Sequence, residues 1–238
     1  EMGCPIHIHV SETAREVEES IAKYGETPVE RLDRLGILRS RTLCAHCVHL
    51  NESDRAIFKR SGASAIYNPD SNMKLASGIA PVAAYQKNGT PWAFGTDGTA
   101  SNNDLSLFGA MDIGTKLQKL GQLDTMALTA AQALHAATLG GARALGLGDK
   151  IGSIEVGKRA DFILLGLDHP NFHPVNDLAS HLVYSTQGFE VHTTVCEGRV
   201  LMENGKFKTL DKEDIFKRAE GWRKKIAAKI KDLKGLST

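Results

Sequence analysis

Four side chains of the kinds that bind metal ions or transfer protons lie in the first hundred residues: His9, Glu12, His46 and Asp97. Imidazole and carboxylate groups are ligands of Zn²⁺, and a catalytic zinc site commonly has about three protein ligands and one water. Zinc lowers the pKa of that water to about 7, which makes hydroxide available at neutral pH. Asp97 could hold such a metal and take the proton of the water, and Glu12 could protonate a substrate atom. These residue types predict a hydrolytic metal site.

Each of these residues also has a purely structural explanation. His9 and His46 could be buried histidines with satisfied hydrogen bonds, and Asp97 before Gly98 could form an ordinary turn. Glu12 could be a charge in the first turn of a helix. A site is favoured because these residues fall at the ends of successive predicted strands, where the chemistry of parallel α/β proteins gathers.

Two local motifs leave the kind of metal site open. His7 and His9 lie two apart in the run IHIHVSET at 6–13, which could be the His-x-His pair that opens a metallohydrolase or one ligand on a later strand. Cys44 and Cys47 form a lone C-x-x-C without a second pair, which is a weak zinc signal. The H-x-E…P-C-x-x-C signature of base deaminases and the H-E-x-x-H motif of metalloproteases are both absent.

Alternating strands and helices must position these side chains. Apolar, β-favouring runs predict strands at 6–10, 41–48, 63–67 and 91–96. Capping residues, prolines and glycines predict helices between them, including a capping box at Thr13–Glu16, and further helices at 105–120 and 125–145. The alternation predicts parallel βαβ units, from either a doubly wound sheet or part of a (β/α)8 barrel. Asn68 joins His9, His46 and Asp97 as a polar residue at a strand end.

The pattern changes after Gly146. Short strands are predicted at 160–165, 182–185, 191–196 and 199–203, followed by an amphipathic helix with a basic face. We therefore expect three parts: an α/β part at residues 1–146, a β-rich part at 147–208, and a C-terminal helix at 209–238.

Composition excludes several classes of protein. The net charge of +1 over 238 residues predicts no general affinity for nucleic acid or for anionic membranes. Four cysteines are too few for a disulfide scaffold, and no apolar segment of membrane-spanning length or signal peptide is found, so we expect a cytoplasmic protein with reduced thiols. The chain begins at Glu1 rather than at an initiator methionine, and we expect it to be part of a longer protein.

Several stretches resemble one known family. They are HVSET at 9–13, AHCVHL at 45–50, NPDSNMKLASGIAP at 68–81, GTDGTASNN at 95–103, ATLGGARALGLGDKIGSIEVGKRADFILL at 137–165 and SHLVYSTQG at 180–188. Together they are similar to the C-terminal portion of the amidohydrolase superfamily. The branch indicated contains the 5-methylthioadenosine/S-adenosylhomocysteine deaminases and the triazine chlorohydrolases.

The resemblance implies the second half of a (β/α)8 barrel, the C-terminal part of a small β-rich domain, and a terminal helix. It places His9 on the fifth-strand metal histidine and Asp97 on the eighth-strand aspartate that binds metal and acts as base. It places His46 beside the reactive water, Glu12 on the acid that engages the substrate ring, and Asn68 to Asn72 in the pocket wall. One divalent ion is implied, Zn²⁺ first, although nitrogen and oxygen ligands also suit Fe²⁺, Mn²⁺ and Ni²⁺. The family's first-strand His-x-His would lie upstream of Glu1, and His7 would then be a packing or supporting residue.

The implied activity is the hydrolytic deamination of an adenine-type nucleoside, in which metal-bound hydroxide attacks the amine-bearing ring carbon and ammonia leaves. Two alternatives stay open: a triazine-type chlorohydrolase or guanine-type deaminase, and a non-catalytic fragment that lacks the first-strand His-x-His. The expected partner is a small-molecule substrate such as a purine nucleoside or related heterocycle. The chain would form a homo-oligomer or be complemented by the missing N-terminal half.

Overall fold

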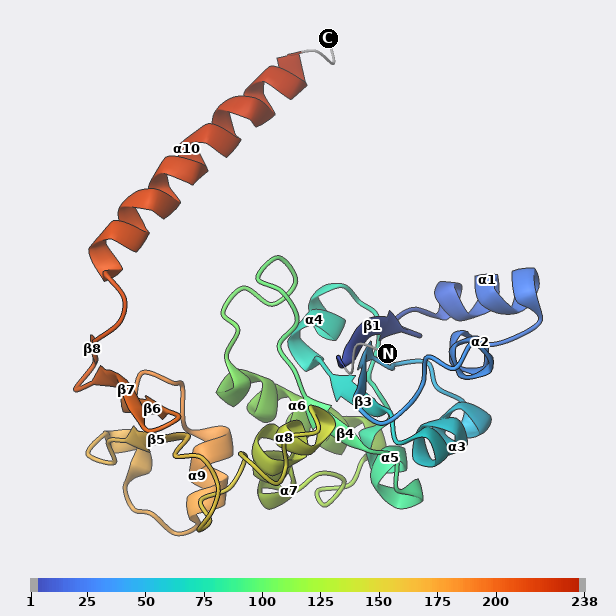
Figure 1. The fold of residues 1–238 in the computed structure, drawn as a ribbon, viewed down its shortest axis with the longest axis horizontal. Coiled ribbons are helices and arrows are strands. Elements are labelled where there is room, and N and C mark those ends of the chain that lie inside the picture. The colour runs from blue at the N-terminus through green and yellow to red at the C-terminus, as the bar shows by residue number, and fades with distance from the viewer. Residues whose placement is uncertain (1–3, 236–238) are drawn as a thin grey trace.

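The computed structural model describes residues 4–235 and shows an α/β chain with two separate four-stranded sheets (Figure 1). The first sheet has the order β1-β2-β3-β4, and each neighbouring pair is parallel. Its strands are β1 (Ile6–Val10), β2 (Thr42–His46), β3 (Ser64–Tyr67) and β4 (Trp92–Phe94). The four strands predicted from 6 to 96 are therefore confirmed as strands. Because all four strands run parallel, their carboxyl ends lie along one edge of the sheet.

Helices connect and follow these strands. They are α1 (Ala14–Tyr24), α2 (Pro28–Arg34), α3 (Glu52–Ser61), α4 (Pro69–Lys74), α5 (Val82–Asn88), α6 (Leu107–Gln122), α7 (Ala130–His135), the π-helical turn η1 (Ala136–Gly140) and α8 (Gly141–Ala144). The helix expected at 125–145 starts later, because the Thr129 hydroxyl caps α7 through the Gln132 N–H. The short helix α4 was not anticipated.

The start of α1 differs from the predicted capping box. The Thr13 hydroxyl accepts the Glu16 N–H as expected. The Glu16 carboxylate does not bond the Thr13 N–H in return, but accepts the N–H groups of Ser11 and Glu12. The carboxylate thus reaches past the cap into the loop that leaves β1.

The core lies between the parallel sheet and its helices. Val10, Phe58, Tyr67, Phe94 and Met111 belong to one buried cluster. Every residue of β3 is buried, as expected for an inner strand of a parallel sheet. β1 is an edge strand of the described sheet, and its alternate residues His7 and His9 are exposed on one face.

The second sheet is antiparallel, with the order β5-β6-β7-β8. Its strands and associated helices are β5 (Phe162–Leu165), η2 (Pro170–Phe172), α9 (Leu178–Tyr184), β6 (Val191–Cys196), β7 (Arg199–Glu203) and β8 (Lys206–Phe207). The predicted strands near 160–165, 191–196 and 199–203 are confirmed.

The strand predicted at 182–185 is wrong, because this segment belongs to helix α9. The Asp177 carboxylate caps the helix by accepting the Ser180 N–H, and Val183 is fully buried. α9 packs against α6 and α7, so tertiary contacts override the β propensity of the Leu-Val-Tyr run.

The last helix, α10 (Lys212–Gly235), extends away from both sheets in Figure 1. Within residues 4–235, no helix combines the length and the apolar character needed to cross a membrane.

Candidate metal and catalytic site

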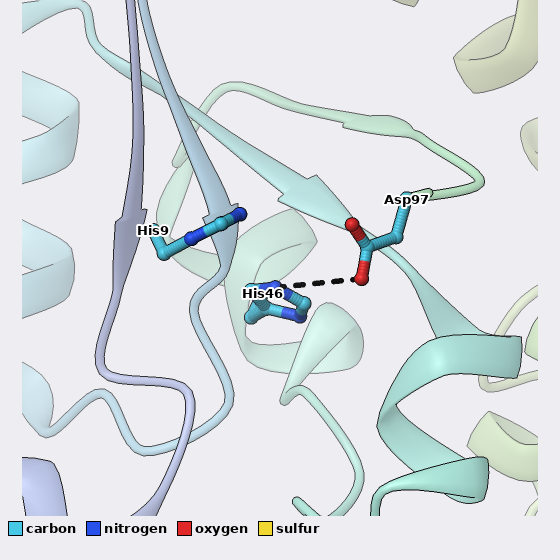
Figure 2. Close-up of side chains that lie close together, drawn as sticks. All are labelled: His9, His46 and Asp97. Carbon is cyan, nitrogen blue, oxygen red and sulfur yellow. Dashed lines mark ion pairs between the residues drawn. The ribbon is translucent and has the colours of Figure 1, made fainter. Parts of the chain in front are cut away.

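Three of the expected residues meet at the carboxyl edge of the parallel sheet. One ligand atom from each of His9, His46 and Asp97 lies within 4.8 Å of the others, and no other such group occurs within residues 4–235 (Figure 2). His9 is the fourth residue of β1, His46 ends β2, and Asp97 follows β4 by three residues. Residues that are 37 and 51 positions apart along the chain therefore come together because their strands run parallel in one sheet and end at the same edge.

The backbone at this edge is strained. Ser11, His46, Cys47 and Asp97 all have positive φ values, of 49°, 73°, 50° and 59°, although none is glycine. Such conformations cost about 1–3 kcal/mol each and persist only where the surrounding structure holds them. Four such residues at the ends of three strands support the choice of this edge as the candidate site.

His46 is held in one orientation by a buried amide. Its Nδ1 lies 2.8 Å from Oδ1 of Asn72, and only 1% of His46 is exposed. With the amide oxygen as acceptor, Nδ1 carries the hydrogen and the Nε2 lone pair faces the site. Nε2 lies 3.7 Å from Oε2 of Glu12 and 4.0 Å from Oδ2 of Asp97. His46 thus presents an acceptor or ligand nitrogen to both carboxylates.

Hydrogen bonds stabilise the charged form of the Asp97 carboxylate. Its Oδ2 accepts hydrogen bonds from the hydroxyls of Ser71 (2.6 Å) and Ser101 (2.7 Å). Burial raises the pKa of Asp97, but these two hydroxyls, the Gly98 backbone N–H and the nearby His46 lower it by more, to about 2. The carboxylate is therefore ionised at neutral pH.

Glu12 reaches the same edge from the loop after β1. Its Oε1 accepts a hydrogen bond from the Ser77 hydroxyl (3.1 Å), and its Oε2 faces His46. Glu12 is half-buried, so its carboxyl group can contact both the site and a molecule bound over it.

Asn68 occupies a different environment from the other four. It is 3% exposed at the N-terminal end of α4, and its side chain packs close to Gly95 of the β4 end. Its contact with substrate stays a prediction. The exposed His7 does not belong to the donor group.

The hydrogen bonds that hold the site residues in place are not predicted by the sequence. Ser71, Asn72 and Ser77 each donate to or accept from one of Asp97, His46 and Glu12, and all three come from α4 and the turn after it. The resemblance places Ser71 and Asn72 in the pocket wall, but it predicts no bond to Asp97 or His46 and gives Ser77 no role. The short polar side chains just beyond the buried strand β3 are the local signal for such bonds.

The residues present fit a metal ion. Two imidazoles and one carboxylate supply nitrogen and oxygen donors, the set that Zn²⁺ and several other divalent ions use. His46, expected only beside the water, contributes a third donor to the group. Cys44 and Cys47 are buried free thiols outside it, and burial raises the pKa of Cys47 well above its usual value.

Comparison with known families and proteins gives a consistent result. The model of the amidohydrolase family matches residues 1–201. A 5-methylthioadenosine/S-adenosylhomocysteine deaminase of Caldanaerobacter subterraneus subsp. tengcongensis is 49% identical over 219 residues, which are 92% of this chain and 51% of that protein. A protein of the same name from Aquifex aeolicus is 43% identical over 233 residues, or 98% of this chain and 54% of that protein.

Two solved structures of hydrolases with zinc are also similar to this chain. An adenosine deaminase from Xanthomonas campestris with bound zinc has a TM-score of 0.91 and 41% identity, covering 94% of this chain and 51% of that one. An atrazine chlorohydrolase from Arthrobacter aurescens complexed with zinc has a TM-score of 0.86 and 27% identity, covering 92% and 48%. The chain spans about half the length of the relatives it matches.

Proposed function

Since the chain belongs to the amidohydrolase family, we propose that it supplies the metal-binding edge of a hydrolytic deaminase for adenine-type nucleosides, of the 5-methylthioadenosine/S-adenosylhomocysteine class. The observation that carries this proposal is the meeting of His9, His46 and Asp97, with Glu12 beside them, at one sheet edge. The deaminase names of relatives at 42–49% identity support the choice of reaction.

The proposed architecture is half of a barrel. The parallel strands β1 to β4 would be strands five to eight of a (β/α)8 barrel, in which active sites lie at the carboxyl ends of the strands. Residues 1–146 would form this half, residues 147–208 part of a composite β domain, and residues 209–238 a terminal part that contains α10 (Lys212–Gly235). Residues 1–3 and 236–238 of these ranges lie outside the described residues. A first-strand His-x-His from the N-terminal half would complete the ligand set.

His9 and Asp97 would hold the metal ion, with Nε2 of His46 directed at the same point. Such an ion, when bound, lowers the pKa of a coordinated water to about 7. His46 Nε2 orients the attacking water by accepting one of its hydrogens. The ionised Asp97 carboxylate takes the proton of that water and passes it to the departing amine.

Glu12 gives the second proton. Its carboxyl group donates to the ring nitrogen next to the amine-bearing carbon, so that negative charge does not accumulate on the ring during attack. The Ser77 hydroxyl holds Oε1 of Glu12 by a hydrogen bond, and Oε2 lies 3.7 Å from Nε2 of His46. Deamination also requires a proton on the amine before it leaves, which chloride displacement does not, and the Asp97 carboxylate supplies it. The chlorohydrolase likeness is also more distant, at 27% identity.

Two proteins are tested. One is the 238-residue chain, and the other is the longest protein encoded in the same reading frame, which we call the full product. Metal content and ammonia release are measured with 5-methylthioadenosine, S-adenosylhomocysteine and guanine, and chloride release with atrazine. We expect one bound divalent ion in the full product, ammonia from the two nucleosides, and loss of activity on chelation. The 238-residue chain should be inactive.

Four variants of the full product separate the roles. His9→Ala and Asp97→Asn should lose metal, whereas His7→Ala, on the same exposed face of β1, should keep it. Glu12→Gln should keep the metal and lose about 100- to 10,000-fold in rate, the usual contribution of general acid catalysis. A full product that binds no metal would refute the enzyme proposal, and an active Glu12→Gln variant would remove the role of Glu12. Full activity of the 238-residue chain would contradict the proposal that an N-terminal half completes the ligand set.

A further inference from the structure

The backbone of the loop that carries Glu12 is hydrogen-bonded to the carboxylate of a second glutamate, Glu16. The Ser11 N–H donates to Oε1 of Glu16 at 2.8 Å, and the Glu12 N–H donates to Oε2 at 2.7 Å. Both oxygens of one carboxylate are thus used on two consecutive backbone donors. Hydrogen bonds to a charged acceptor are roughly twice as strong as neutral ones. The Thr13 hydroxyl bonds the Glu16 N–H at 3.2 Å and fixes the base of the side chain.

This loop needs such support because its backbone is strained. Ser11 is fully buried with φ of 49°, a left-handed conformation that is unfavourable for serine. Its carbonyl accepts the N–H groups of Val48 and His49 at 3.1 and 3.0 Å, which ties the loop to the segment after β2. The Ser11 carbonyl is therefore bonded to the segment after β2, and the N–H groups of Ser11 and Glu12 are bonded to Glu16. These bonds fix the backbone between β1 and α1 on both sides.

The position of the Glu12 carboxyl follows from this backbone. Its two oxygens lie 3.1 Å from the Ser77 hydroxyl and 3.7 Å from Nε2 of His46. A movement of the Glu12 backbone by about 1 Å would take the carboxyl group out of the first contact. Misplacement of that size can reduce a rate about 100-fold.

We propose that Glu16 is a positioning residue for Glu12, whose carboxylate fixes the Ser11–Glu12 backbone so that the Glu12 carboxyl group stays at the sheet edge. The inference rests on the proposed function of Glu12 as proton donor. This role requires that both side-chain oxygens of residue 16 accept a hydrogen bond. Glutamine has the same shape but presents an NH₂ group to one of the two N–H donors. A residue that merely stabilised the start of α1 would not act through Glu12.

The experiment measures kcat and KM for ammonia release by the full product carrying Glu16→Gln. The matched control is Glu19→Gln, one turn further along α1, where the exposed glutamate pairs with Arg15. We expect Glu16→Gln to lower kcat by about 10- to 100-fold with unchanged metal content. We expect Glu19→Gln to stay within about twofold of wild type.

A double-mutant cycle shows whether Glu16 acts through Glu12. In the Glu12→Gln background, Glu16→Gln should reduce kcat by less than about twofold further, because two residues that act as a unit are not additive. An equal loss in both backgrounds, or a Glu16→Gln rate equal to that of Glu19→Gln, would overturn the inference while leaving the proposed function intact. Wild-type full product that releases no ammonia would overturn the proposed function, and this inference with it.

Amide hydrogen exchange supplies a readout that does not depend on activity. The N–H groups of Ser11 and Glu12 should exchange slowly in wild type and in Glu19→Gln, and distinctly faster in Glu16→Gln, because one of their two acceptors is lost. Unchanged protection of both amides in Glu16→Gln would contradict the proposed clamp even if the rate fell.

Discussion

The ends of β3 and β4 approach each other closely because residue 95 has no side chain. A Cβ atom at Gly95 would lie 2.7 Å from Cγ2 of Ile66 and closer still to Oδ1 of Asn68, whereas ordinary contact begins at 3.4 Å. The Gly95 N–H donates to the Tyr67 carbonyl at 2.9 Å, so the two backbones are bonded at this level. Gly95→Ala must therefore move either the end of β4 or the two side chains by about 0.7 Å or more.

The expected effect has two parts. Overpacking of a well-packed interior typically costs about 1–3 kcal/mol, and we expect the free energy of unfolding to fall by that amount. Asp97 lies only two residues further along, so a displaced β4 end also moves its carboxylate relative to His9 and His46. Because a misplacement of about 1 Å can cost 100-fold in rate, we expect a loss of activity between about 10- and 100-fold in the full product.

Urea unfolding and steady-state kinetics measure the two parts, with Gly98→Ala as the matched control for stability. A Cβ atom at Gly98 meets nothing within 4 Å, and Gly98 does not have a left-handed φ. Its free energy of unfolding should stay within about 0.5 kcal/mol of wild type. If Gly95→Ala were as stable as Gly98→Ala and bound metal normally, the close approach of the two strand ends would not matter and the reasoning would be refuted.

Three further substitutions test the packing and charge of the chain. Asn72→Ala should lower the free energy of unfolding in urea by about 1–3 kcal/mol, because Nδ1 of the buried His46 loses its hydrogen-bond partner. Asn72→Asp keeps an acceptor oxygen and should lower this free energy by less. Equal decreases in the two variants would contradict the prediction. Gly114→Ala in α6 should lower the thermal unfolding midpoint, because its Cβ would lie 2.6 Å from the ring of Phe94. Gly121→Ala on the same helix should raise the midpoint, because alanine has a higher helix propensity than glycine. Equal shifts in the two variants would contradict the prediction. Burial raises the pKa of Asp54 above its ordinary 3.8, so the folded chain holds the proton more tightly than the unfolded one. The stability of wild type relative to Asp54→Asn should therefore fall as pH rises from 3.8 through the raised folded value, and a difference that rises with pH in urea titrations would contradict the sign.

Local signals in the sequence were sufficient to predict the four strands of the parallel sheet and most of the helices that connect them. Apolar β-favouring runs, helix caps such as Thr13 and Asn51, and glycines at helix ends such as Gly62 depend on neighbours a few residues away. The same signals failed at 182–185, where the burial of Val183 against other helices makes the segment helical. Propensity is a weak guide where a segment's burial is decided by distant parts of the chain.

The sequence by itself determined which residues could do chemistry and that they would fall on one edge, because successive parallel strands bring their carboxyl ends together. It did not determine how those residues are held. The Asn72 bond to His46 and the Ser77 bond to Glu12 join positions 26 and 65 residues apart. The reach of Glu16 past its own helix cap depends on the strained turn at Ser11. Such bonds depend on side-chain directions and backbone conformations that only the packed chain establishes. The spacing of residues along the sequence therefore does not predict them.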